Sequence, residues 1–87
     1  MKQLRLQQLQ RFVIVMEADE AGGYHAFCPT LPGCHSQGET LEEARQNIQE
    51  AVQCHIESLL KDKAPVPQEQ EEFISTVQVQ VPAAHGR

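Results

Sequence analysis

Apolar residues dominate two neighbouring stretches near the start of the chain, and both stretches predict β-strands. Residues 11–17 read RFVIVME, a run rich in β-branched side chains that is apolar at both alternating sets of positions. Such a run is typical of a strand whose two faces are both covered. Residues 24–28, YHAFC, predict a second strand. The polar segment DEAGG at 19–23 predicts a turn that joins the two strands into a hairpin.

A rigid bend and a short third strand follow the hairpin. Pro29 and Pro32 each restrict the backbone angle φ, and Gly33 lets the chain turn because glycine has no Cβ. Residues 34–38 then predict a short third strand.

The segment that begins at Thr40 predicts a long helix, with residues typical of helix ends at both its start and its finish. Thr40 is an N-cap candidate with Glu43 three positions later, which is a capping box, and Glu42 adds a second negative charge to the first turn. Lys61 and Lys63 suit the last turn, and the two prolines that follow prevent its continuation. The stripe expected to face the core recurs at three- and four-residue spacing, at Leu41, Ala44, Ile48, Ala51, Val52, His55, Ile56 and Leu59.

Alternation returns at residues 72–81 and predicts a last, half-exposed strand. Phe73, Val77, Val79 and Val81 share one face, and Pro82 ends the segment. The predicted order is β-β-β-α-β, an antiparallel-dominated sheet with one long helix packed on a face, which belongs to the α+β class. We expect a single domain over 11–82 and a C-terminal tail at 83–87. Residues 1–10 form either an N-terminal arm or an extension of the first strand.

One helix cannot cover both faces of the first strand, which predicts self-association. A domain of 87 residues buries only roughly 60–65% of the surface that its unfolded chain exposes, so its core is thin. We therefore expect the uncovered face to pack against a partner or another copy, in a homodimer or a homotetramer.

Charge narrows the choice of partner. The net charge is −5, and the seven lysines and arginines are scattered along the chain without a basic stripe. Such a surface repels phosphate backbones and favours a basic protein, so we expect no direct nucleic-acid partner. The chain offers neither a signal-peptide core nor a membrane-spanning run, and its three cysteines cannot all pair. We expect a cytoplasmic protein.

The segment 19–44, DEAGGYHAFCPTLPGCHSQGETLEEA, resembles the signature of the HicB-like antitoxin family. The shared features are an acidic turn, Gly-Gly-Tyr, P-x-L-P-G-C, and G-[DE]-T-x-x-E-A at the start of a helix. The resemblance implies a pared-down ribonuclease H-like domain in an antitoxin that blocks a small RNA-cleaving toxin. Longer family members carry a C-terminal DNA-binding domain, whereas only six residues follow Val81 here, so we expect none.

The candidate catalytic and metal-binding residues favour a protein that is not an enzyme. A ribonuclease H-type site needs a carboxylate in the middle of the first strand to hold metal ions, and Ile14 stands there. His25, Cys28, Cys34 and His35 flank the bend, but their spacing matches no zinc motif, and alternation sends His25 and Cys28 to opposite faces. We expect no catalytic residues, no metal and no cofactor.

The acidic hairpin turn and the adjoining bend form the predicted partner-binding site. Tyr24 would be an aromatic anchor, and Glu17, Asp19, Glu20 and Glu39 would supply charge complementary to a basic toxin. The leading hypothesis is an antitoxin-like protein that inhibits a small basic RNA-cleaving toxin of the HicA type by protein contact. The alternative is an orphan homo-oligomeric binding module with no toxin partner.

Overall fold

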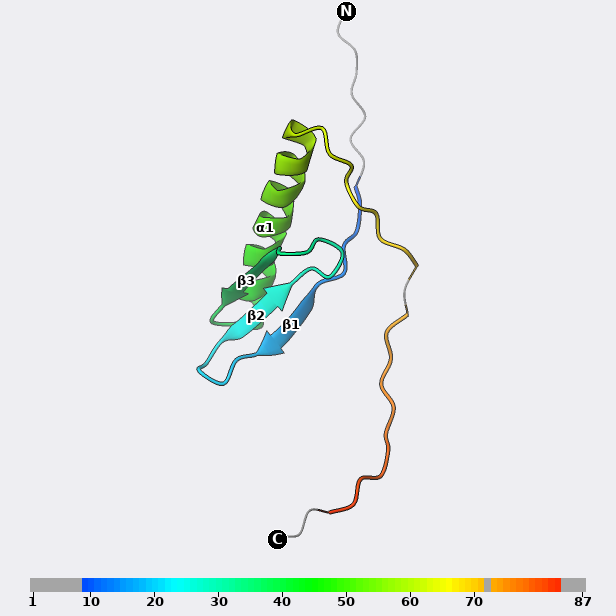
Figure 1. The fold of residues 1–87 in the computed structure, drawn as a ribbon. Helices are drawn as coiled ribbons and strands as arrows, with labels where there is room; N and C mark the ends of the chain where they lie inside the picture. The colour runs from blue at the N-terminus through cyan, green and yellow to red at the C-terminus, as the bar shows by residue number, and fades with distance from the viewer. Residues whose placement is uncertain (1–8, 72, 84–87) are drawn as a thin grey trace, which may run out of the picture.

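The computed structural model describes residues 9–71 and 73–83, and it forms a three-stranded sheet with one long helix across it (Figure 1). The strands are β1 (Val15–Ala18), β2 (Tyr24–Phe27) and β3 (His35–Gly38), and the helix is α1 (Leu41–Lys61). The sheet is antiparallel in the order β1-β2-β3. The α+β fold class is thus confirmed. The second and third strands lie within one residue of the predicted bounds, and the helix begins directly after the predicted N-cap, Thr40.

The last predicted strand is not formed in the part of the chain that the structure describes. Residues 73–82 are extended and belong to no strand of the sheet, and in Figure 1 this segment leaves the sheet altogether. An alternating sequence gives a segment the right side-chain pattern for a strand, but the strand exists only where a neighbour supplies hydrogen bonds. The β-β-β-α order replaces the expected β-β-β-α-β order.

β1 starts four residues later than predicted, because its partner strand β2 ends at Phe27. Val15 pairs with Phe27, the last residue of β2, and the next N–H, that of Cys28, already bonds to the Cys34 carbonyl at 3.0 Å in the bend. Residues 9–14 therefore have no partner strand in the sheet. Phe12 and Ile14 still pack against the core from this extended approach to the sheet.

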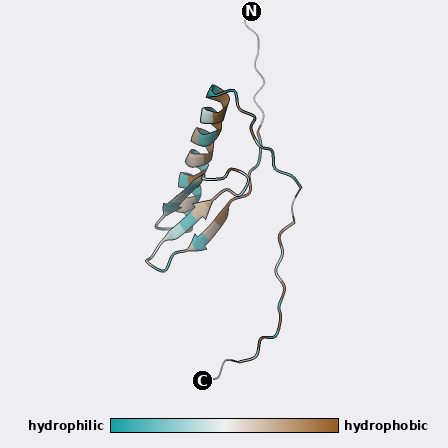
Figure 2. Cartoon of the chain, in the orientation of Figure 1, coloured by the Kyte–Doolittle hydropathy of each residue, from teal (hydrophilic) through white to brown (hydrophobic). Residues whose placement is uncertain are grey.

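The core lies between the sheet and the helix. The side chains of Ala26, Cys28 and Cys34 are buried on the sheet side, and those of Ala44 and Ile48 are buried on the helix side. Leu31 is fully buried because the proline bend folds back on itself through hydrogen bonds between Leu31 and both cysteines. Partly buried residues of the predicted helix stripe extend the core, and Figure 2 shows hydrophobic and hydrophilic residues alternating around α1. Leu41, expected in that stripe, is 50% exposed.

The helix start forms as predicted, and the last turn holds Lys61 as expected, whereas Lys63, also expected there, lies beyond the C-cap Asp62. Thr40 caps the first turn by accepting a hydrogen bond of 3.0 Å from the Glu43 N–H, and the Glu43 carboxylate accepts one of 2.6 Å from the Glu39 N–H. Lys63 adopts φ 59° just after the C-cap, and its N–H bonds to the Leu60 carbonyl. A left-handed residue at this place is a common way to end a helix.

Gly38 lets the helix start directly against the sheet. A Cβ at this position would lie 2.8 Å from the Cα of Ala44, a separation that real Cβ atoms do not show. The glycine therefore permits the close approach of β3 to the first turn of α1. Since α1 contacts β3 far more extensively than β1, the helix is displaced toward one edge of the sheet.

Candidate partner-binding surface

The five residues predicted to bind a partner gather at one end of the sheet. The β1–β2 register places Glu17 opposite His25 and Ala18 opposite Tyr24, while the β2–β3 register places Tyr24 opposite Gly38. Glu39 follows Gly38 directly, so it reaches the same end. Asp19 and Glu20 lie in the turn that joins β1 to β2.

The same register sends Tyr24 and Glu17 to opposite faces of the sheet. Partners in an antiparallel pair project from one face, and successive residues alternate between faces. Glu17 projects with His25 and Gln37 from the face away from the helix. Tyr24 projects with Ala26 toward the helix, where it is partly buried against the core. A partner that contacts all five residues must therefore wrap around the end of the sheet.

The acidic residues differ in what they do within the fold. Asp19 shapes the turn: its carboxylate accepts a hydrogen bond of 2.9 Å from the Ala21 N–H, and its backbone bonds to Gly22 and Gly23. Gly22 and Gly23 have φ angles of 109° and 78°, which glycine adopts without strain. Glu17, Glu20 and Glu39 are exposed. Together with Asp19, these exposed carboxylates form the anionic edge at this end of the sheet.

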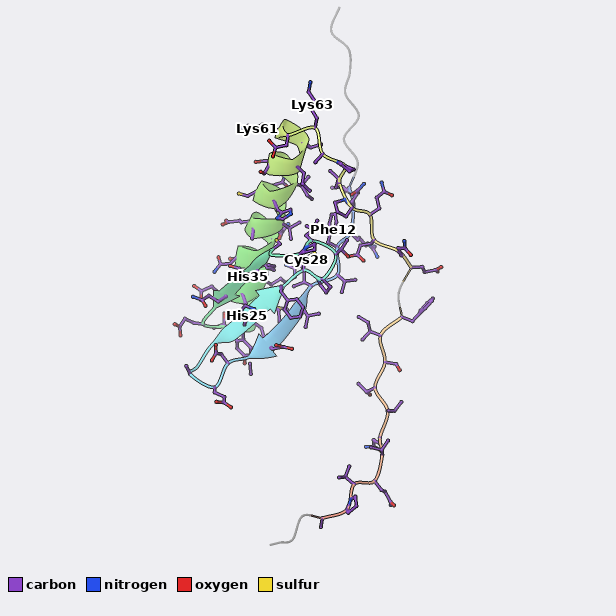
Figure 3. The ribbon with its side chains drawn as sticks, viewed as in Figure 1. Phe12, His25, Cys28, His35, Lys61 and Lys63 are labelled. Carbon is purple, nitrogen blue, oxygen red and sulfur yellow. The ribbon has the colours of Figure 1, made fainter. Side chains whose placement is uncertain are left out.

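A second surface, the open face of the sheet, lies on the side away from the helix. Val15 and Phe27 face each other across β1 and β2, and Phe27 faces His35 across β2 and β3. The His25 ring lies 6.1 Å from the Phe27 ring and 5.6 Å from the His35 ring, centroid to centroid (Figure 3). The sequence did indicate that the first strand was apolar on both faces, but it did not show that the two histidines join this surface.

The buried thiols belong to the core and not to a reactive site. Cys28 and Cys34 are free and buried, and Cys54 is free and exposed on the helix. Burial, and then the neighbouring Cys28, raise the pKa of the Cys34 thiol above its ordinary value of 9.0. A raised pKa lowers the thiolate fraction at neutral pH and so lowers reactivity.

His25 and Cys28 lie on opposite faces of the sheet, as predicted. His25 faces the open side, and Cys28 faces the core. Across residues 9–71 and 73–83, no three His, Cys, Asp or Glu side chains come together in a way that could hold a metal ion. No helix in these residues is both long and apolar enough to cross a membrane.

Comparison with known proteins places this arrangement in a family. Residues 12–83 match the family described as "HicB_like antitoxin of bacterial toxin-antitoxin system". The chain belongs to the HicB-like antitoxin family. The crystal structure of the N-terminal domain of the Burkholderia pseudomallei antitoxin HicB superposes with a TM-score of 0.54. That domain is 33% identical, and the match covers 74% of this chain and 69% of that one.

Several UPF0150 proteins are also similar to this HicB-like chain. One from Synechocystis sp. is 55% identical over 62 residues, which cover 71% of this chain and 78% of the relative. Another, from Thermoplasma acidophilum, is 40% identical over 65 residues, which cover 75% of this chain and 94% of the relative. The HicB-like domain thus accounts for most of the length of these small proteins.

Proposed function

We propose that this HicB-like protein is an antitoxin that binds and inhibits a small, basic, RNA-cleaving toxin by protein contact alone. The observation that carries the proposal is the family match over residues 12–83. The anionic edge supports it, because exposed carboxylates on a chain with net charge −5 attract a cationic partner. The protein would act in the cytoplasm, where such a toxin meets its RNA.

The side chains of the sheet support inhibition without catalysis. Glu17 is the carboxylate of β1, it is exposed at the end of the strand, and it faces His25 instead of a second carboxylate. A two-metal nuclease needs several converging carboxylates. We propose that the protein blocks its partner by covering that partner's RNA-binding surface and not by acting on RNA itself.

The proposed contact site is the anionic edge with Tyr24 at its margin. Glu17, Glu20 and Glu39 would attract the partner, and the partly buried Tyr24 ring would give it an apolar contact beside the turn. The backbone hydrogen bonds of the Asp19 turn hold this edge in shape before binding, which reduces the ordering cost of association.

The test is coexpression with the product of a short basic reading frame beside the gene for this chain. We expect the two proteins to copurify, and we expect the purified antitoxin to suppress RNA cleavage by that partner in proportion to its concentration. Suppression must survive EDTA treatment of the antitoxin. A partner that neither copurifies nor loses activity would reject the proposal.

A second candidate is a homo-oligomeric binding module that has no toxin. The open face with Val15, Phe27 and His25 favours it, because no helix of the described chain covers these side chains. Affinity capture from the native cell distinguishes the two candidates. Recovery of a small basic nuclease supports the antitoxin, whereas recovery of this chain alone supports the module.

A further inference from the structure

The C-terminal segment 73–81 has the side-chain pattern of a strand but lies apart from any sheet. Its sequence, FISTVQVQV, carries no charged residue. The side chains of Phe73, Val77, Val79 and Val81 are 87%, 82%, 74% and 75% exposed. An apolar stripe of period two that faces water is a pairing surface without a partner.

The sheet offers a matching acceptor along the outer edge of β1. β1 is the first strand in the order β1-β2-β3, so one side of its backbone faces no strand of the described residues. Because α1 is displaced toward β3, a groove of about 660 Å³ remains between the helix and the approach to β1. Apolar side chains from both walls line this groove: Phe12, Ile14, Met16, Ile48, Val52 and Ile56.

The segment cannot fill this groove on its own chain while its linker stays in place. The Glu69 carboxylate accepts hydrogen bonds from the Val13 N–H at 2.8 Å and from the Thr30 hydroxyl at 2.7 Å. These bonds hold the linker beside Val13, and the chain then runs in the same general direction as β1 (Figure 1).

A segment that continues from Glu69 in this direction extends past the end of its own sheet. Pairing from that point would place residues of about 71–74 beside Val15–Ala18, where β1 ends. At about 3.3 Å per residue, Val77 to Val81 would then lie roughly 10–23 Å beyond the last paired residue. The groove lies in the opposite direction, along the approach to β1.

We propose that residues 73–81 form the fourth strand of a second copy, on the outer edge of its β1, with the apolar stripe turned into that copy's groove. The exchange is reciprocal, so two copies form a closed two-fold dimer in which each gives and receives one strand. The chemistry of the segment favours a second copy of this chain over a different protein as the acceptor. The segment is uncharged and supplies the one element of the β-β-β-α-β order that each sheet lacks.

Dimer mass tests the proposal first, on the purified full chain without any toxin. Light scattering should give twice the 9.8 kDa chain mass for the wild type. The double variant Val77→Asp/Val79→Asp should be monomeric at the same concentration with unchanged helical circular dichroism. The matched control Thr76→Asp/Gln78→Asp adds the same charge to the other face of the segment and should stay dimeric.

Crosslinking then identifies the chain that receives the strand. In a Cys54→Ser background, one chain carries Val79→Cys and a second, affinity-tagged chain carries Val52→Cys. A short thiol crosslinker should join the two different chains, and the background chain without new cysteines should give no product. A monomeric wild type, an aspartate variant that remains dimeric, or a Val52→Cys/Val79→Cys chain that closes only on itself would each overturn the proposal.

Discussion

The Glu69 carboxylate accepts a hydrogen bond from the backbone N–H of Val13, 56 positions earlier in the chain. The same oxygen accepts a hydrogen bond from Thr30, so a single side chain joins the linker after α1, the approach to β1 and the proline bend. Residues 9–14 have no strand pairing, so the hydrogen bond from Val13 to Glu69 helps to hold the approach to β1 in position. The following prediction tests this role.

Replacing Glu69 with Ala should lower the free energy of unfolding by about 1–2 kcal/mol, because two hydrogen bonds to a charged, partly buried group are lost. Urea unfolding followed by circular dichroism measures the change. Glu71→Ala is the matched control, since Glu71 is exposed, and it should leave the midpoint unchanged. Equal midpoints for the two variants would remove the structural role of Glu69.

Replacing Gly38 with Ala should destabilise the fold by about 1–3 kcal/mol, the usual cost of forcing extra atoms into a packed contact. The new Cβ would meet the backbone of Ala44 in the first turn of α1. Thermal unfolding reports the loss. The neighbouring exposed residue supplies the control, and Gln37→Ala should unfold within a degree or two of the wild type. A Gly38→Ala protein as stable as the control would mean that the helix can shift away from β3 at little cost.

Replacing Thr40 with Ala should cost about 1 kcal/mol, because the Glu43 N–H loses its capping oxygen. Thr40→Ser retains a hydroxyl at the same place and should recover most of the stability. Chemical denaturation of the three proteins in parallel gives the comparison. If Ser and Ala behave alike, the hydroxyl does not stabilise the helix start.

The cysteines should differ in reactivity, and stability should fall in alkaline solution. A maleimide should label the exposed Cys54 first and should label Cys28 and Cys34 only as fast as the protein opens. The folded state raises the pKa of Cys34, so it holds that proton more tightly than the unfolded state does. This contribution is therefore complete below the ordinary pKa and is lost as the pH rises through the folded value. Cys34→Ala should show a smaller loss above pH 9.0. An unchanged slope would contradict the assignment.

Reversing charge on the anionic edge should slow association with the toxin. The triple change Glu17→Lys, Asp19→Lys and Glu20→Lys should reduce the association rate about tenfold or more at low salt, the size expected of electrostatic steering. Stopped-flow or biosensor kinetics over a range of salt concentrations measures this effect. Tyr24→Ala should mainly speed dissociation, because an anchor acts after encounter.

A control with the same charge change elsewhere separates steering from net charge. Glu50, Glu57 and Glu71 are exposed and lie outside the anionic edge, so changing all three to Lys should slow association much less. If the two triple variants associate at the same rate, the anionic edge is not the contact site. The open face with Phe27 and His25 would then be the next surface to mutate.

The sequence by itself determined the features whose hydrogen bonds close within a few residues. Thr40 and Glu43 cap the helix from three positions apart, and the glycines at 22 and 23 form the turn with Asp19, which is why both features could be predicted. The family signature lies in these same local segments, so it too was visible in the sequence, and the match over 12–83 confirms it.

Only the tertiary structure decided which strands have neighbours and which face each side chain occupies. Residues 11–17 and 72–81 both have the sequence pattern of a strand. Pairing nevertheless begins only at Val15, and residues 73–82 join no strand of the sheet, because a strand needs a partner that the rest of the fold must bring beside it. Likewise, the pattern could not separate Tyr24 from Glu17. Their opposite faces follow from the register of β1 and β2 together with the face on which α1 packs, and both depend on contacts between residues far apart in the chain.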